Sequence, residues 1–503
     1  MNTLNPRSDI TDITDMPDTE VCEYFAPLFT PRAIAVVGAS ASGDNRANGF
    51  IRQQISFGFK GAVYPIHPTA MEIEGHKAYP TLADTPTPID YALIAIPAAR
   101  VPDTLRAANN RVRFAHVLAS GFGEVESGKA LQQDLVAAAN EGGVRFFGPN
   151  CNGGYSPRGG LTFTAGASDE PGGVGIISQS GGLGVDIIRR GQERGLRFSG
   201  VMTVGNCADL GPSDLLAFYL ADPHTKVIGL YVESIADGRR FFETLRRAKG
   251  RKPVIILKGG RTALGHAAAV SHTGALAGDA RVWHALSRQT GAVLTGSLEE
   301  FIDAAMTFQM VPPNTMSVRG DKGPIALFGN GGGVGVLAVD AFAERHLQVR
   351  AFSKDTQARL TAVGLPPGTS VANPIDVPAG TLAAKDGKVV ESMMEMIFEA
   401  ETLSAFVLHL NLTVVWSHLV GTNDKLVENL IAAAARIRDE TSGERTIQIV
   451  LRSDGREDID SRKRLCKTLA LESGFPVYDE LANAAAGLAA LRFHETFLAS
   501  LAE

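Results

Sequence analysis

The stretch Ala33-Ile34-Ala35-Val36-Val37-Gly38-Ala39-Ser40 decides the fold class of this chain. Its unbroken apolar run is typical of a strand that is buried on both faces of a parallel sheet. Two further glycines, Gly43 and Gly49, follow before a helical pattern begins. A buried strand, a glycine-rich turn and a helix in this order form the first part of a βαβ unit. The stretch therefore predicts a doubly wound α/β fold.

The same alternation of strand and helix continues along the chain in three blocks. The Pro-containing polar stretch from Val311 to Gly320 is typical of a linker between the second block and the third. We therefore predict three consecutive doubly wound domains, over 21–156, 157–310 and 324–503, with a flexible tail over 1–20 and a linker over 311–323. Strands are expected at 62–66, 91–96, 114–118 and 144–147, at 174–178, 200–204, 227–232 and 254–257, and at 325–328, 405–410 and 446–451.

Composition narrows the class of protein. The chain has 503 residues, of which 45% are hydrophobic and 20% are charged, and a net charge of -6. These are ordinary values for a globular protein, and the negative charge gives no general attraction to nucleic acid or anionic membranes. The four cysteines lack both metal-site spacing and disulfide density, and no apolar run is long enough to span a bilayer. We therefore expect a cytoplasmic protein with no metal of its own, no nucleic-acid partner and no membrane anchor.

Three loops of the first block are expected to meet at one cleft. They are Gly38-Ala39-Ser40, the turn at Pro97 and the pair Ser120-Gly121, and each follows a predicted strand. Ligands of doubly wound sheets bind at the carboxyl ends of the strands, where glycine lets backbone N–H groups approach a phosphate. The spacing is not the dinucleotide pattern G-x-G-x-x-G, so NAD is not indicated. A plain tight turn is the alternative interpretation.

Two later glycine turns have the form of anion sites. Ser180-Gly181-Gly182 follows the strand over 174–178, and Asn330-Gly331-Gly332 follows the strand over 325–328. A helix is expected to begin at each turn, and its N-terminal N–H groups and dipole favour a negatively charged ligand. Turn chemistry, or close packing of helix on sheet, would also explain these glycines.

A histidine with unusual neighbours lies in Ala269-Val270-Ser271-His272-Thr273-Gly274-Ala275-Leu276-Ala277-Gly278. Its small and polar neighbours cannot bury an imidazole ring well, and a helix beginning near Thr273 would aim free N–H groups toward it. This environment suits a histidine that handles phosphate, while a capped loop with an incidental histidine is the alternative. Glu233 ends the strand over 227–232, where its carboxylate either reaches a cleft or opens a surface loop.

The segment Gly148-Pro149-Asn150-Cys151-Asn152-Gly153 joins the first block to the second. Turn chemistry alone explains its glycine, proline and asparagine residues. A functional interpretation places Asn150 and nearby backbone N–H groups against a carboxylate or an acyl phosphate. No base for a Cys151 nucleophile is evident, so we expect a structural thiol there. Lys258 and Arg261, just before the His272 loop, either neutralise phosphate or are only solvated.

Together these motifs resemble the nucleoside-diphosphate-forming acyl-CoA synthetases, the superfamily of succinyl-CoA synthetase and ADP-forming acetyl-CoA synthetase. The resemblance covers roughly residues 25–490, and about a dozen short matches occur in family order. They are Val37–Ser40, Gly61–Pro65, Ser120–Phe122, Gly148–Cys151, Ser178–Gly182, Gly205-Asn206, Ala208-Asp209, Asp214–Leu216, Tyr231–Glu233, Lys258–Arg261, Ser271–Ala275, Asn330–Gly332 and Asn373–Asp376.

The resemblance implies a role for each motif. His272 would be phosphorylated and carry the phosphoryl group between two sites, and Glu233 would hold its ring. The helices at Ser180-Gly181-Gly182 and Asn330-Gly331-Gly332 would bind the phosphate, and Asn150 with Cys151 would line the acyl site. The first block would be a Rossmann-like CoA-binding domain, followed by two flavodoxin-like domains of the succinyl-CoA-synthetase type. In that first block, the residues that contact CoA would be Gly38, Ala39, Ser40, Pro65, His67, Pro97, Ser120 and Gly121.

Two departures from the family pattern fall near the expected CoA site. His67-Pro68 stands where many relatives have Asn-Pro, and the tip over 44–48 differs from the usual loop that contains proline and lysine. The contacts to the adenine and the phosphates of CoA are therefore expected to differ in detail. The third block matches the family poorly after about Val414, which suggests a mostly interfacial role.

The chain contains neither a P-loop nor a block that resembles an ATP-grasp domain. The resemblance therefore implies an alpha-type subunit of an ADP-forming (or other NDP-forming) acid–CoA ligase that acts on a small carboxylic acid. ATP or ADP and Mg²⁺ would bind to an ATP-grasp beta-type partner in a hetero-oligomer. Two alternatives stay open: a CoA- or carbamoyl-type acyltransferase on the same scaffold without nucleotide, and a non-catalytic CoA-sensing module.

Overall fold

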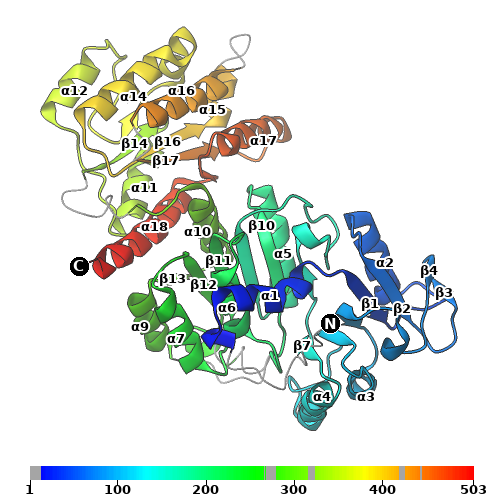
Figure 1. The fold of residues 1–503 in the computed structure, drawn as a ribbon. Helices are drawn as coiled ribbons and strands as arrows, with labels where there is room; N and C mark the ends of the chain where they lie inside the picture. The colour runs from blue at the N-terminus through cyan, green and yellow to red at the C-terminus, as the bar shows by residue number, and fades with distance from the viewer. Residues whose placement is uncertain are drawn as a thin grey trace. The chain divides into compact units, whose positions relative to one another are not determined.

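The structure is a computed structural model that describes residues 13–265, 267, 279–314, 323–418, 425–441 and 445–502. The chain divides into two compact units, Met1–Leu298 and Glu299–Glu503 (Figure 1). Within the described residues, the first unit holds two large sheets, parallel except for one edge strand, and a short two-stranded hairpin, and the second unit holds one parallel sheet. The division falls ahead of the predicted linker, so most of helix α10 (Leu298–Met310) groups with the third block.

The first sheet is wholly parallel and has the order β2-β1-β5-β6-β7. All five residues of β1 are buried, as the apolar run predicts. The strand order reverses between β1 and β5, which makes their carboxyl ends the switch point where doubly wound sheets bind ligands. The strands are β1 Ala33–Val37, β2 Ala62–Ile66, β5 Ile89–Ile94, β6 Val112–Val117 and β7 Arg145–Phe147, with the hairpin β3 Glu72–Ile73 and β4 His76–Lys77, and the helices are α2 Arg46–Phe57, α3 Val101–Arg106 and α4 Lys129–Glu141.

The second sheet repeats this scheme with the order β13-β12-β11-β9-β10-β8, where only the edge strand β8 is antiparallel. Its order reverses between β9 and β11. Short edge strands such as β8 and β13 could not be predicted from the alternation of apolar and polar residues, because two or three residues are too few to show it. The strands are β8 Gly154–Tyr155, β9 Val174–Ser178, β10 Phe198–Thr203, β11 Val227–Val232, β12 Val254–Lys258 and β13 Val293–Thr295, and the helices are α5 Gly181–Glu193, α6 Pro212–Ala221, α7 Gly238–Ala248 and α9 Ala280–Thr290.

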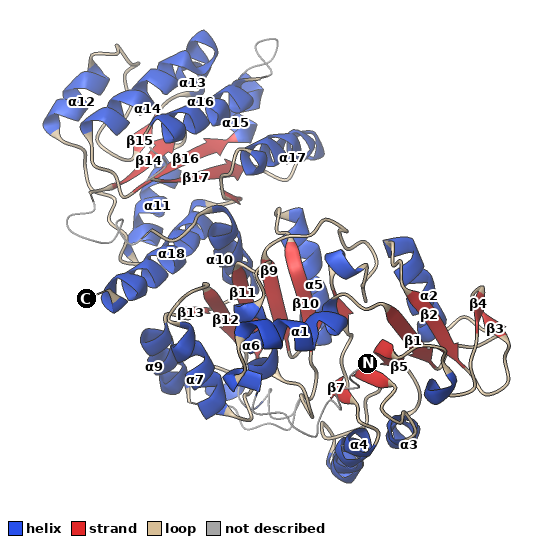
Figure 2. Cartoon of the chain, in the orientation of Figure 1, coloured by secondary structure: helices blue, strands red, loops and turns tan. Residues whose placement is uncertain are grey.

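The third sheet, β15-β14-β16-β17-β18, is parallel and reverses between β14 and β16. Figure 2 shows it between α12, α14 and α16 on one face and α11 and α18 on the other. No described helix is long and apolar enough to cross a membrane. The strands are β14 Ile325–Gly329, β15 Ile375–Asp376, β16 Ala405–Asn411, β17 Thr446–Arg452 and β18 Val477–Tyr478, and the helices are α11 Gly332–Ala343, α12 Lys354–Thr361, α13 Ala379–Ala383, α14 Lys388–Ala400, α15 Leu412–His418, α16 Leu426–Glu440, α17 Glu457–Glu472 and α18 Leu481–Leu501.

The described part of the predicted tail differs from the expectation of a loose segment. A 3₁₀ turn, Ile13–Asp15, precedes helix α1, Asp18–Phe29, and Ile13 is buried. The ring of Phe29 stacks on that of Phe218 in α6, with centroids 4.3 Å apart. Asp18 and Glu20, whose charge suggested a solvated tail, lie in the first helical turn, where acidic side chains complement the helix dipole. Residues 1–12 lie outside the described residues.

Candidate functional sites at the three switch points

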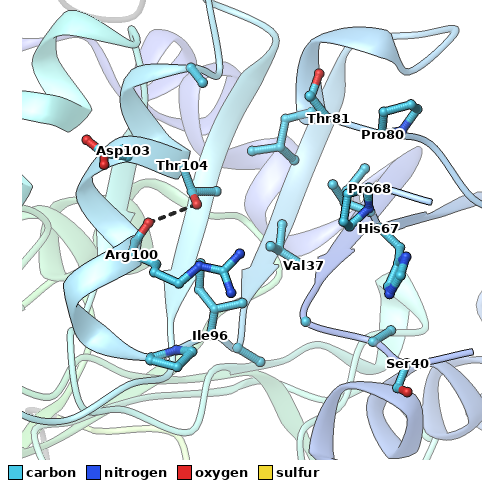
Figure 3. A pocket seen from close by; sticks show the side chains of 17 residues that line it. Val37, Ser40, His67, Pro68, Pro80, Thr81, Ile96, Arg100, Asp103 and Thr104 are labelled. Atoms are coloured by element: carbon cyan, nitrogen blue, oxygen red, sulfur yellow. Dashed lines mark hydrogen bonds between the residues drawn. The ribbon is translucent and has the colours of Figure 1, made fainter. Parts of the chain in front are cut away.

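The switch point of the first sheet holds a cleft of about 680 Å³. It is lined by the predicted residues Gly38, Ala39, Ser40, His67 and Pro97 (Figure 3). Gly38 has φ +107°, and a Cβ atom there would lie 2.3 Å from the carbonyl oxygen of Ala95. Only glycine therefore lets the end of β1 pass so close to the end of β5. The size of the cleft is that of a small-molecule or cofactor site.

His67 presents a donor to this cleft. Its Nδ1 accepts hydrogen bonds from the N–H groups of Thr69 and Ala70, at 3.2 and 3.0 Å. Because Nδ1 is an acceptor in this arrangement, the neutral ring carries its proton on Nε2. Figure 3 shows the ring on the side of the cleft that Ser40 also occupies.

Three other predicted CoA contacts lie outside the lining of the cleft. Pro65 is inside β2, where its carbonyl accepts a hydrogen bond from the N–H of Tyr79 at 3.0 Å. Ser120 and Gly121 form the next loop along the sheet edge. A Cβ atom on Gly121 would lie 3.8 Å from that of Ala98, so this loop adjoins the wall of the cleft that contains Pro97.

The junction between the first two sheets continues from that loop. The N–H of Asn150 donates to the carbonyl of Ala119 at 2.9 Å, and Asn150 has φ +59° and an exposed side chain. The side-chain amide of Asn206 donates to Glu124 at 2.5 Å, and its backbone N–H donates to the carbonyl of Pro149 at 3.0 Å. The loop after β6, the junction and the loop after β10 are thus connected by hydrogen bonds.

The Cys151 thiol is buried, which fits the structural thiol that the sequence predicts. The side chain is buried and its Sγ faces the carbonyl of Val117 at 3.8 Å. Burial raises the pKa of the thiol well above its ordinary value. Nε2 of the buried His116 lies 3.0 Å from the carbonyl oxygen of Cys151, and Nδ1 lies 3.0 Å from the hydroxyl of Tyr91. Any contact of Cys151 with an acyl group would therefore involve its backbone.

His116 predicts a pH dependence of stability. Burial lowers its pKa from 6.5 to about 4. As pH falls below 6.5, His116 becomes protonated in the unfolded chain, whereas the buried His116 of the folded chain stays neutral until about pH 4. The free energy of unfolding of the first unit should therefore decrease across this window, by about 3 kcal/mol. Trp283 lies in the first unit and Trp416 in the second. In a Trp416→Phe background, Trp283 fluorescence would therefore report the unfolding of the first unit by urea. His116→Gln should flatten the profile, and an equally steep profile in that variant would contradict this origin.

The switch point of the second sheet brings together Ser180 and Glu233. Ser180 is the N-cap of α5, and its Oγ accepts a hydrogen bond from the N–H of Leu183 at 3.3 Å. No acidic side chain lies in the first turn of α5. The side-chain amide of Asn152, from the junction, covers Gly181, where a Cβ atom would lie 2.8 Å from it. Gly182 is exposed.

Gln179 connects Glu233 to the start of α5. Its Oε1 accepts hydrogen bonds from the N–H groups of Glu233 and Ser234, and its Nε2 donates to the carbonyl of Ser234 at 2.9 Å. The Glu233 side chain is only 6% exposed, and its Oε1 accepts a hydrogen bond from the hydroxyl of Tyr231 at 3.1 Å. A buried carboxylate is thus held next to the N-terminus of a helix.

The two basic residues before the His272 loop both donate to backbone carbonyls, although Lys258 is buried and Arg261 is exposed. Lys258 is buried, and its Nζ donates to the carbonyl of Glu233 at 2.8 Å and to that of Gly259. Burial lowers the pKa of Lys258. Arg261 donates to the carbonyl of Gly296 at 2.6 Å. His272 itself lies outside the described residues, so its predicted role stays a prediction.

The switch point of the third sheet holds Asn330, Gly331 and Gly332. The Asn330 side chain is 3% exposed, and its Oδ1 accepts the N–H of Asn411 at 2.8 Å. Gly331 is the N-cap of α11, and its N–H donates to the carboxylate of Asp376 at 2.7 Å. A phosphate here would therefore share the helix end with a carboxylate, in contrast to the start of α5.

Several residues of these sites receive no role from the sequence motifs, although Gln179 and Asn206 lie in stretches that match the family. Asn152, Gln179 and Asn206 act through contacts with loops that are distant in the chain. Arg100, whose guanidinium points into the first cleft in Figure 3, belongs to the short helix that follows Pro97. For Asn152 and Arg100, the only indication is their place in a loop or turn that follows a predicted strand.

A cleft at one switch point and a helix end with a buried carboxylate at the next are the features that the resemblance to the succinyl-CoA-synthetase class implies. Residues 32–156 match the model of a CoA-binding domain, and residues 171–308 match that of the succinyl-CoA ligase like flavodoxin domain.

Curated relatives and solved structures agree with these matches. Over 371 residues the chain is 35% identical to the alpha subunit of ADP-forming acetate–CoA ligase I of Pyrococcus furiosus, covering 72% of this chain and 78% of that one. The alpha subunit of its isozyme II is also 35% identical, with 71% and 76% covered. Acetyl-coenzyme A synthetase 1 of Ca. Korarchaeum cryptofilum, solved with phosphate and ADP, superposes with a TM-score of 0.79 at 29% identity over 95% of this chain and 99% of that one.

The chain belongs to the family of ADP-forming acid–CoA ligases and is of the alpha-subunit type. The predicted family and α/β fold class are thereby confirmed, and so is the prediction of a ligase. These relatives do not favour the acyltransferase or the CoA-sensing alternative.

Proposed function

We propose that this chain binds CoA and a small carboxylic acid and carries a phosphoryl group on His272 between the acid and a nucleotide. ATP or ADP and Mg²⁺ would bind to an ATP-grasp partner subunit. In this proposal residues 21–156 form the CoA-binding domain, residues 157–310 the domain with the phosphohistidine loop, and residues 324–503 the third domain. The relatives named as acetate–CoA ligases make acetate the first acid to test.

Three reversible steps would account for the reaction. The γ-phosphoryl group of ATP passes to the His272 ring, and ADP leaves. The phosphohistidine then gives this group to the acid, which forms an acyl phosphate and restores the histidine. Finally the CoA thiol, losing its proton, attacks the acyl carbon, and the C–O bond to phosphate breaks to release inorganic phosphate and the thioester. A neutral imidazole is a good phosphoryl acceptor near pH 7.

The observation that carries this proposal is the continuity of the two switch points in the first unit. Gly121 adjoins Ala98 at the wall of the CoA cleft, and Glu124 of the same loop is hydrogen-bonded to Asn206. Asn206 is bonded to the junction, and Asn152 of the junction covers the start of α5. A continuous series of loop contacts therefore connects the cleft of the first sheet to the helix end beside Glu233 in the second sheet. A thioester group and a phosphate bound along it would be neighbours.

The electrostatics of α5 favour the transferred phosphate. A helix N-terminus carries about half a positive charge and directs N–H groups at its ligand. Because the first turn of α5 lacks acidic residues, no carboxylate of the helix itself would compete with a dianion there. Glu233 would instead hold the ring of the incoming histidine, as the family resemblance implies.

The partial reaction from the thioester side tests the proposal without the partner. The purified chain, given acetyl-CoA or another short acyl-CoA together with ³²P-labelled inorganic phosphate, should become labelled and release CoA and the acid. No nucleotide is needed, because in this direction the phosphoryl group comes from inorganic phosphate through the acyl phosphate. A chain that binds CoA but takes up no label from any acyl-CoA, nor from labelled acetyl phosphate, would refute the phosphohistidine route.

Glu233→Gln should slow this labelling by about 10- to 100-fold, the value of a charged hydrogen-bond partner. The amide keeps the size of the side chain but loses the charge that would hold the ring, so the fold should be retained. Glu243→Gln, which removes a carboxylate that pairs with Arg239 on the surface of α7, is the matched control and should label at the rate of the unmodified chain. Equal rates for both variants would remove Glu233 from the mechanism.

A further inference from the structure

We propose that Arg100 binds the 3′-phosphate of CoA and so lets the cleft distinguish CoA from its 3′-dephospho form. This inference rests on the proposed binding of CoA in the cleft. It concerns one side chain that the family motifs do not include, in a cleft whose usual lysine-containing loop is replaced at residues 44–48.

The positive charge in the lining of the cleft comes from one arginine. Among the lining residues, all of which the structure describes, Arg100 is the only lysine or arginine. The one acidic lining residue, Asp103, pairs with Arg106 at 2.6 Å. Arg100 is exposed and forms no ion pair with any residue in the described ranges. Its guanidinium is turned into the cleft between Ile96 and Val37 (Figure 3).

Three nearby cations outside the cleft are already engaged. Arg52 pairs with Glu74 at 2.6 Å and also with Asp44. Arg106 pairs with Asp134 at 2.9 Å and Glu141 at 2.6 Å in addition to Asp103. The Nζ of Lys77 lies over the ring of Tyr79, 5.4 Å from its centroid. Arg100 is therefore the one lysine or arginine that both lines the cleft and pairs with no acid in the described ranges.

The chemistry of CoA indicates which phosphate this cation binds. CoA carries a diphosphate, which backbone N–H groups of a glycine turn can hold, and a 3′-phosphomonoester with three terminal oxygens and about two charges at pH 7. The turn at Gly38 lies at the end of β1, and Arg100 lies at the end of β5, on the other wall of the switch point. With the diphosphate at the turn, the monoester is the group that needs a full positive charge. The planar fork of arginine matches its oxygens with two parallel hydrogen bonds.

Calorimetry on the full-length chain with CoA and 3′-dephospho-CoA tests this assignment. The unmodified chain should bind CoA about 10- to 100-fold more tightly than 3′-dephospho-CoA. Arg100→Gln should remove that preference by weakening CoA alone, and Arg100→Lys should restore part of it. Lys60→Gln is the control, because the exposed Lys60 precedes β2, at the edge of the sheet opposite the cleft, and does not line the cleft. It should keep the preference of the unmodified chain.

The other outcomes separate the two proposals. If Arg100→Gln weakens both ligands equally, the side chain contacts the diphosphate or adenosine, and the inference is wrong. If it weakens neither, the 3′-phosphate binds elsewhere, and the inference is wrong again. If the unmodified chain binds neither ligand, the CoA cleft of the proposed function fails as well. A melting temperature for Arg100→Gln equal to that of the unmodified chain would show that a lost preference is not an effect of unfolding.

Discussion

His272→Ala is expected to abolish phosphorylation of the chain from both directions. In the complex with the ATP-grasp subunit, γ-³²P-labelled ATP and Mg²⁺ should label the unmodified chain and leave the variant unlabelled. Without the partner, acyl-CoA and labelled phosphate should give the same contrast. The effect is a complete loss because alanine has no atom that can accept the phosphoryl group. Phosphohistidine is labile to acid and stable to base, so the chemistry of the label identifies the acceptor.

His224→Ala is the matched control for this experiment. His224 is an exposed histidine in the first unit, between α6 and β11, and its removal should leave the labelling intact. Label that persists in His272→Ala, or that survives acid, would assign the phosphoryl group to another residue. Retention of CoA binding by His272→Ala, measured by calorimetry, would show that the loss is chemical and not structural.

Much of this fold follows from the apolar runs. The runs over 33–37, 62–66 and 174–178 become β1, β2 and β9, because a strand buried on both faces needs a continuous apolar sequence. Helix α1 was missed because its acidic first turn resembles a solvated tail. Its apolar residues Val21, Phe25 and Phe29 recur at helical spacing, and the structure shows that Phe218 of α6 covers the two phenylalanine rings.

The sites could be predicted in outline for a related reason. Gly38, Ser180, Glu233 and Asn330 all follow predicted strands, and a parallel sheet gathers such positions at one edge. What the sequence could not show is which side chains meet across that edge. Gln179 bridges to Ser234, and Lys258 donates to the carbonyl of Glu233. Contacts of this kind depend on the register of neighbouring strands, which a local motif does not contain.

The chain without its partner is expected to have no ATP-dependent ligase activity. Phosphoryl transfer from ATP depends on Mg²⁺ and on exact positioning of the γ-phosphate, and the chain has neither a P-loop nor a segment that resembles an ATP-grasp domain. The purified chain should form no thioester from ATP, acid and CoA, and should bind ATP no more tightly than roughly millimolar. The partial reaction from acyl-CoA and phosphate should still proceed, because the proposed residues for it lie in the first unit. Addition of the ATP-grasp subunit should restore the whole reaction and tight nucleotide binding together. If the chain alone turned over ATP, acid and CoA, its nucleotide site would lie within residues 320–503, and the third domain would have a catalytic role of its own.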